Sequence, residues 1–237
     1  TLCSYHKTFI GAVESGAVPP ASYAVTTSLS CDGNLNTFRY LQKKNHVPFT
    51  LLDVPYTDDD ASVDYLASQL ETMVHDMEER LGRKFQPEKL KESLRIENET
   101  RSELLRFYEL AQRHYYPGEI IHQLYMMMGT HLLMGTQKFL DLIRFMNEEI
   151  QTFPEFTGKR ILWIHLIPYY QESLKYYFNS SEKYQLLAGD IVFDFTDTLD
   201  PEDPFRSLAR KLIKNVYNGS YSHKAQAIGH LTDTFHP

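Results

Sequence analysis

The sequence predicts an α/β protein with two Rossmann-like parallel-sheet domains and a helical cap or connector. Short apolar, β-rich segments alternate with helical segments in the first 60 residues, and the same alternation returns after residue 155. This order is typical of parallel sheets joined by crossover helices. The long consecutive helical segments between the two regions exceed what one crossover needs, which is why we expect a cap or connector. With 237 residues, 42% of them hydrophobic, the chain can bury one large core or two small ones.

The first alternating region is expected to contain two strands and three helices. The first four elements are helix 5–15, strand 23–28, helix 34–44 and strand 49–54. Pro55 ends the second strand because proline cannot donate to a sheet hydrogen bond. The three aspartates at 58–60 favour the start of a helix over 61–81, since carboxylates cap a first turn and suit its positive end. We interpret this acidic run as a helix start and not as a metal site, and Gly82 as the stop of the helix.

Two long helical segments follow, over 87–112 and 119–150. Apolar residues recur in both at three- and four-residue spacing, which is the period of one helix face. The second segment contains Gly129 and Gly135, and either glycine could break it.

A second domain is expected over 156–237, after a first domain over 1–155. Its predicted elements are strand 161–167, helix 171–179, strand 191–194 and helices 204–215 and 222–234. The chain starts without Met, and its last helix would lead into a further strand. We therefore expect both ends to be cuts from a longer protein, and the second domain to be truncated.

Charge and hydropathy argue against two classes of partner. The formal net charge is −7 and the 24 Lys and Arg form no basic stripe, so we expect no nucleic acid bound through its phosphates. The longest apolar runs are interrupted by His, Gln or Lys, and none approaches the length of a membrane span. No signal peptide is recognisable at the start. We expect a cytoplasmic protein.

Both cysteines of the chain stand where a helix is expected to begin. Cys31 follows an apolar strand and precedes Asp32, Gly33 and Asn34, and Cys3 precedes the first helix. A thiol at a helix N-terminus faces unpaired N–H groups and the positive end of the helix dipole, which favour the thiolate that binds metals or acts as a nucleophile. In open α/β sheets, ligands bind at the carboxyl ends of strands, where such cysteines would lie. The ordinary alternative is a pair of small buried thiols, and a single disulfide has no other support in the sequence.

Short motifs in a fixed order along nearly the whole chain resemble the 2-hydroxyacyl-CoA dehydratase family, which includes the benzoyl-CoA reductase subunits. The matching residues are 3–7 (Cys-Ser-Tyr-His-Lys) with Gly11 and Gly16, 27–34 (Thr-Ser-Leu-Ser-Cys-Asp-Gly-Asn), 53–56 (Asp-Val-Pro-Tyr), 65–82 and 225–237. Each motif is short, but their order and spacing together are fairly specific.

The resemblance implies a lyase subunit that holds one [4Fe–4S] cluster through three cysteines. By this resemblance Cys3 and Cys31 match the first two ligands, and the third lies beyond residue 237, so the chain by itself lacks it. Family dehydratases eliminate water from a 2-hydroxyacyl-CoA by way of a ketyl radical, and the product is an enoyl-CoA. The implied partners are the acyl-CoA substrate, an ATP-dependent iron–sulfur activator protein that delivers one electron, and a homologous partner subunit. Three protein ligands would leave one iron open to water or a substrate oxygen, and such chemistry implies anaerobic conditions.

Two other functions fit the same resemblance. One is a component of an ATP-driven low-potential reductase, of the benzoyl-CoA reductase or double-cubane-cluster type, in which no hydroxyacyl substrate is dehydrated. The other is a non-catalytic electron-transfer partner subunit that completes an interface and binds no substrate.

Several other residues have both a functional and an ordinary interpretation. His165 falls near the end of a predicted strand and could be a catalytic residue that moves protons near a bound thioester, although a hydrogen-bonded core histidine is at least as common. His6 could lie beside the cluster, or could cap a helix or face solvent. The methionines at 126–128 and 134 could line an acyl-chain site but are more often helix core. The basic residues are better explained as solvated helix faces than as CoA-phosphate ligands; they are Lys43, Lys44, Arg206, Arg210, Lys211 and Lys214.

Overall fold

The structure of the chain is a computed structural model that describes residues 2–29 and 31–237. Thr1 and Ser30, the latter within one of the motifs above, lie outside the described residues. The chain divides by its contacts into two compact units, each described by itself below. Unit 1 contains residues 1–86 and 205–220, and unit 2 contains residues 87–204 and 221–237. The boundary that the order of elements predicts near residue 155 falls inside unit 2, because the long helices there pack on the second sheet.

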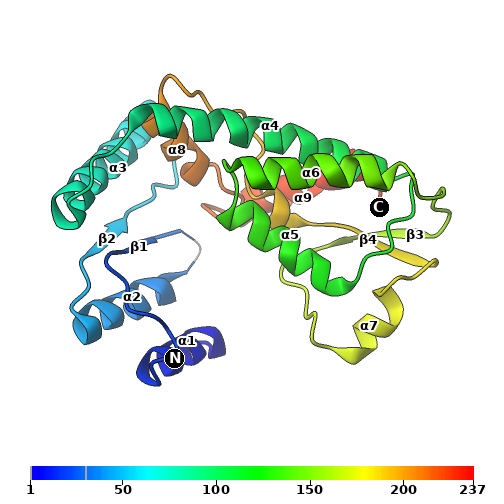
Figure 1. The fold of residues 1–237 in the computed structure, drawn as a ribbon, viewed down its shortest axis with the longest axis horizontal. Helices are drawn as coiled ribbons and strands as arrows, with labels where there is room; N and C mark the ends of the chain where they lie inside the picture. Colours follow the sequence, from blue (N-terminus) through cyan, green and yellow to red (C-terminus); the bar gives the residue numbers. More distant parts are fainter. Residues whose placement is uncertain (1, 30) are drawn as a thin grey trace. The chain divides into compact units, whose positions relative to one another are not determined.

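Unit 1 is built around a parallel two-stranded sheet. Strands β1 (Ala24–Thr27) and β2 (Phe49–Leu52) pair in parallel and are joined through helix α2 (Asp32–Asn45). Helix α1 (Ser4–Glu14) packs against α2 (Figure 1). All four elements fall where the sequence predicts them, to within two residues at each end, because strand and helix periods are both clear in this region.

Two further helices complete unit 1. Helix α3 (Asp60–Leu81) begins with Asp59 as its N-cap, whose carboxylate accepts the backbone N–H of Ser62 at 2.7 Å, and ends at Gly82, which has a φ of 63°. The acidic run is therefore a helix start, as the sequence predicts. Hydrogen bonds from Ser62 hold the pKa of Asp59 below its usual value. Helix α8 (Pro204–Ile213) packs on α3 and β2 through a core that contains Leu66, Ala209 and Ile213.

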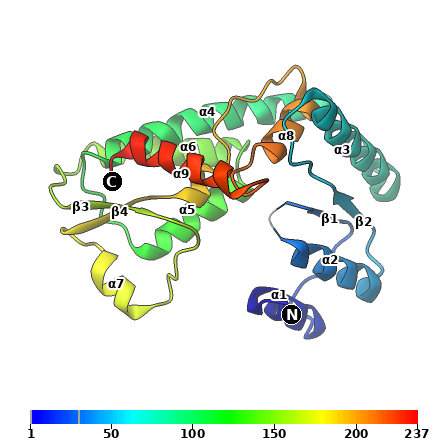
Figure 2. The same cartoon turned by 180° about the vertical axis from the view of Figure 1, so that it is seen from behind.

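Unit 2 contains three of the long helices expected from the sequence. They are α4 (Pro87–Ala111), α5 (Ile120–Leu132) and α6 (Gln137–Ile150). The predicted segment 119–150 breaks at Gly135, whose φ of 78° suits glycine and few other residues, whereas Gly129 stays within α5. Figure 1 shows α4 and α6 side by side, and Figure 2 shows helix α9 (Tyr221–Phe235) running along the same helices from behind. Aromatic side chains join these helices, and Tyr108 of α4 contacts the ring of Phe235.

The sheet of unit 2 is also a parallel pair, and here the sequence prediction is partly wrong. Strands β3 (Lys159–Trp163) and β4 (Tyr184–Gly189) are joined through helix α7 (Glu172–Phe178). The predicted strand over 161–167 ends at Trp163. The predicted strand over 191–194 overlaps the 3-10 helix η1 (Asp190–Phe193) instead. The apolar run at 191–193 is fully consistent with a buried strand, but η1 places Val192 and Phe193 in the core without sheet hydrogen bonds.

The described residues therefore form an α/β fold, with mostly helices and two short parallel sheets of two strands each. Among the described residues no helix is both long enough and apolar enough to cross a membrane.

Candidate functional site

Both cysteines lie at helix N-termini in unit 1. Cys3 is the N-cap of α1 and Cys31 is the N-cap of α2, and neither side chain makes a capping hydrogen bond. Both thiols are free and exposed. The alternatives of two buried structural thiols and of a disulfide are therefore wrong. An exposed thiol beside unpaired helix N–H groups is the environment expected for a reactive or metal-binding cysteine.

The imidazole of His6 links the first turn of α1 to Cys31. His6 is only 4% exposed, and its Nε2 lies 3.4 Å from the Sγ of Cys31. Its Nδ1 lies 3.0 Å from the hydroxyl of Thr37, and that hydroxyl donates its hydrogen to the carbonyl of Gly33 at 2.9 Å. Thr37 therefore accepts from the Nδ1–H of His6, which leaves Nε2 of the neutral ring as an acceptor facing the thiol. The burial of His6 excludes the surface role that the sequence left open.

Gly33 makes this contact sterically possible. A Cβ at this position would lie 2.5 Å from the Nε2 of His6 and 3.2 Å from the Sγ of Cys31. The imidazole of His6 thus occupies the space that a side chain at position 33 would need.

Thr37 is the site residue that the sequence analysis missed. It is only 2% exposed and lies one turn after Gly33 on α2. A threonine in a helix with apolar neighbours gives no sign of function by itself. The signal available was its four-residue spacing from Gly33, which puts the two on one helix face.

The donor set of the chain fits part of a three-cysteine cluster site. Cys3 and Cys31 are its only two cysteines. Within 2–29 and 31–237, no three His, Cys, Asp or Glu residues are grouped so that they could hold a metal ion. The chain can therefore offer two thiolates from neighbouring helices, and a third ligand would have to come from outside these residues.

His165 lies in unit 2, in the loop after β3 and not on the strand predicted for it. It is exposed and has a φ of 71°, which is uncommon for a residue with a side chain. Its backbone N–H donates to Oδ1 of Asp190 at 2.6 Å. Asp190 directly follows β4, is only 2% exposed, and also lies 3.5 Å from the ammonium of Lys224. This buried carboxylate thus fixes the loop that carries His165 at the carboxyl ends of β3 and β4, where ligands bind in parallel sheets.

The basic residues considered for CoA phosphates are mostly engaged in ion pairs within unit 1. Arg206 and Arg210 both donate to Asp60, at 2.8 and 3.2 Å, and Lys44 pairs with Glu14 at 2.9 Å. These pairs support the ordinary interpretation of solvated helix faces. Of the methionines, Met126 belongs to the core of unit 2 and also lines an apolar pocket there, and Met134 packs against this core.

Comparison with known proteins identifies the family. The model of the family described as 2-hydroxyglutaryl-CoA dehydratase, D-component, matches residues 1–236. The chain is 26% identical over 99 residues to the alpha subunit of (R)-2-hydroxyglutaryl-CoA dehydratase of Acidaminococcus fermentans, a match that covers 40% of this chain and 21% of that protein.

Two further relatives are also alpha subunits of dehydratases. The (R)-2-hydroxyisocaproyl-CoA dehydratase alpha subunit of Clostridioides difficile is 23% identical over 107 residues, which are 41% of this chain and 26% of that protein. The (R)-phenyllactyl-CoA dehydratase alpha subunit of Clostridium sporogenes is 23% identical over 146 residues, which are 60% of this chain and 36% of that protein. The matched segments thus span only about a fifth to a third of these relatives. Because the family model covers almost every residue, the chain belongs to the 2-hydroxyglutaryl-CoA dehydratase D-component family, as its motifs predict.

Proposed function

We propose that the chain is part of the iron–sulfur subunit of a radical 2-hydroxyacyl-CoA dehydratase, a lyase that converts a 2-hydroxyacyl-CoA to an enoyl-CoA after one-electron activation. The observation that carries the proposal is the pair of free, exposed thiols at the N-termini of α1 and α2, in a chain matched by the family model from residue 1 to 236. The names of the relatives favour dehydration over reduction, since all three are dehydratase alpha subunits.

In this proposal Cys3 and Cys31 supply two of three thiolate ligands to a [4Fe–4S] cluster. When bound, such a cluster can relay an electron and offer an open iron site as a Lewis acid. The chain itself positions the ligands. The His6 ring, held by Thr37, lies against the Sγ of Cys31, and the missing side chain at Gly33 leaves room for that contact.

Metal analysis tests the ligand assignment. We expect the full-length protein, purified without oxygen, to contain about four iron and four sulfide per subunit, the content of one such cluster. Cys31→Ala and Cys3→Ala should each lose most of both, because a cluster held by two thiolates is easily lost. Ser15→Ala, at the opposite end of α1 from Cys3, serves as the control and should keep both. Wild-type protein without iron and sulfide, or a Cys31→Ala variant with full content, would contradict the assignment.

We further propose that His165 moves a proton near the substrate. Its exposed ring and the anchoring of its backbone to buried Asp190 support this role. His165→Gln should lower the rate of dehydration about 100-fold and change its pH dependence, because general acid–base groups contribute on that order. The measurement is the rate of enoyl-CoA formation against pH with activator and ATP. His230→Gln, on the exposed face of α9, is the matched control and should keep the rate. An unchanged rate and pH profile in His165→Gln would show that the residue is structural.

The relatives' names support two partners in this proposal, an acyl-CoA substrate and a partner subunit. The proposal also includes an ATP-dependent iron–sulfur activator and an anaerobic cytoplasm, which rest only on the resemblance of the motifs. We also propose that each parallel pair of strands belongs to a larger Rossmann-like sheet in the whole protein, since each already has the strand–helix–strand crossover of that fold. Interconversion of a 2-hydroxyacyl-CoA and its enoyl-CoA would separate this dehydratase from a reductase component, which would not catalyse it.

A further inference from the structure

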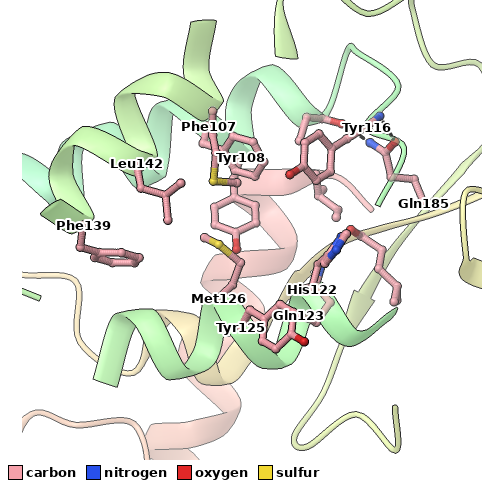
Figure 3. A pocket seen from close by; sticks show the side chains of 14 residues that line it. Phe107, Tyr108, Tyr116, His122, Gln123, Tyr125, Met126, Phe139, Leu142 and Gln185 are labelled. Carbon is pink, nitrogen blue, oxygen red and sulfur yellow. Dashed lines mark hydrogen bonds between the residues drawn. The ribbon is translucent and has the colours of Figure 1, made fainter. Parts of the chain in front are cut away.

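Unit 2 contains an apolar pocket that neither the cysteines nor His165 line. Its volume is about 160 Å³, and its walls come from α4, α5, α6, β4 and the loop after α4 (Figure 3). The lining is mainly aromatic and aliphatic and includes Phe107, Met126, Phe139 and Leu187. None of the described residues that line it is Lys, Arg, Asp or Glu. The pocket therefore suits a neutral and largely apolar ligand.

Two buried polar atoms in the wall of this pocket have no hydrogen-bond partner among the residues that the structure describes. They are the hydroxyl of Tyr108 and the side-chain oxygen of Gln123. Tyr108 is only 1% exposed, and in Figure 3 its ring points from α4 toward Met126 on α5, with the hydroxyl end leading. Burial raises the pKa of Tyr108 above its usual value, so the hydroxyl keeps its hydrogen as a donor. Buried polar atoms nearly always have partners, so two unpaired ones at one pocket point to a missing ligand group.

The amide groups of the wall are otherwise engaged in hydrogen bonds within the protein. Gln185 accepts the backbone N–H of Tyr116 and donates to the carbonyls of Ala111 and His114. The side-chain N–H₂ of Gln123 donates to the carbonyl of Leu186 at 3.3 Å, which holds its oxygen in a fixed direction. Of the fully buried polar atoms in the wall, a ligand would therefore find one donor, on Tyr108, and one acceptor, on Gln123. The side chains of Tyr116, His122 and Tyr125 also line the pocket but are not fully buried.

We propose that this pocket binds a small neutral molecule that has an apolar body about the size of one six-membered ring and carries one hydroxyl group. The size follows from the volume, since an apolar cavity of about 150 Å³ holds benzene. The ligand hydroxyl accepts from the O–H of Tyr108 and donates to the oxygen of Gln123, so both unpaired atoms are satisfied. A carboxylate or phosphate does not fit, because no Lys or Arg lines the pocket and burying an unpaired charge is costly. The inference stands on the pocket alone and does not depend on the cluster.

The test is a ligand-observed NMR titration of the full chain with phenol, anisole, toluene and benzoate. Phenol should bind best, anisole and toluene more weakly, and benzoate not at all. Tyr108→Phe should lower the affinity for phenol about fivefold, which is the effect of one neutral hydrogen bond, and should leave the affinity for toluene unchanged. It should not destabilise the fold, because the atom removed has no partner. Leu142→Trp, a substitution at an exposed position of the lining, should fill the space and abolish binding of phenol and toluene alike.

Each contrary result overturns the proposal. A folded chain that binds no phenol has no such site. If phenol binds no more tightly than toluene, or binds Tyr108→Phe as tightly as the wild type, the pocket does not recognise the hydroxyl. If phenol still binds to Leu142→Trp, its binding site is not this pocket. A competition experiment shows which kind of hydroxyl compound the pocket binds. If a neutral 2-hydroxyacyl thioester displaces phenol, the pocket binds part of the proposed substrate. If the thioester does not displace phenol, the pocket binds a separate small molecule.

Discussion

Asp190→Ala is expected to lower the free energy of unfolding by about 3 kcal/mol, in the range for removing one partner of a buried ion pair. The carboxylate is 2% exposed, accepts the backbone N–H of His165 at 2.6 Å and lies 3.5 Å from the ammonium of Lys224. Its loss removes the acceptor of the His165 N–H and the partner of the Lys224 ammonium, whose side chain is 23% exposed. Urea unfolding measures this change in the free energy of unfolding. It can be followed by the fluorescence of Trp163, the single tryptophan, which is two residues from His165 in the sequence.

Two companion variants make the result specific. Asp190→Asn keeps an oxygen for the His165 N–H and loses only the charge, so it should cost less than Asp190→Ala. Glu172→Ala removes an exposed carboxylate that pairs with Lys175 at 2.8 Å, and it should change stability by less than about 0.5 kcal/mol. If Asp190→Ala costs no more than Glu172→Ala, the carboxylate does not hold the loop, and the geometric support for His165 as a proton carrier is lost.

The sequence predicts most of the fold because most of its elements have a clear period. Unit 1 has alternating strands and amphipathic helices with recognisable stops, such as Gly82, and its elements match closely. The error in unit 2 has a physical cause. Strand β4 contains the buried amide of Gln185, which bonds three backbone groups, whereas the neighbouring segment at 191–193 is entirely apolar. Hydrophobicity alone therefore favours the wrong segment, because the polar groups that satisfy Gln185 come from residues about 70 positions earlier.

For the sites too, only features that are local in the sequence could be predicted. The positions of Cys3 and Cys31 at helix N-termini could be predicted, since each directly precedes a helical pattern. The contact of His6 with Cys31 could not be predicted, because it joins two residues that are 25 positions apart in the sequence. In the sequence, the apolar pocket was visible only through Met126, the one methionine of α5 among its lining residues. Its unpaired hydroxyl on Tyr108 depends on which side chains of four elements meet.

Gly33→Ala is expected to destabilise the protein by about 2 kcal/mol, although alanine is the better helix former. Position 33 lies in the first turn of α2, where replacing glycine would normally stabilise by up to about 1 kcal/mol. The new methyl group would lie 2.5 Å from the Nε2 of His6, and that ring is buried and held by Thr37. Overpacking of this kind typically costs about 1–3 kcal/mol. Chemical denaturation of the wild type and the variant gives the difference.

The decisive comparison is the same substitution in a His6→Ala background. Without the imidazole, the added methyl meets only the Sγ of the exposed Cys31, at 3.2 Å, so Gly33→Ala should become close to neutral there. The difference corresponds to a coupling of about 2 kcal/mol between positions 6 and 33, large for a pair of residues. Gly11→Ala, in α1 with open space around it, should stabilise in both backgrounds and serves as the control. If Gly33→Ala destabilises equally with and without His6, the ring does not occupy that space. Because the clash needs no metal, the cycle tests the geometry around Cys31 independently of whether a cluster is bound.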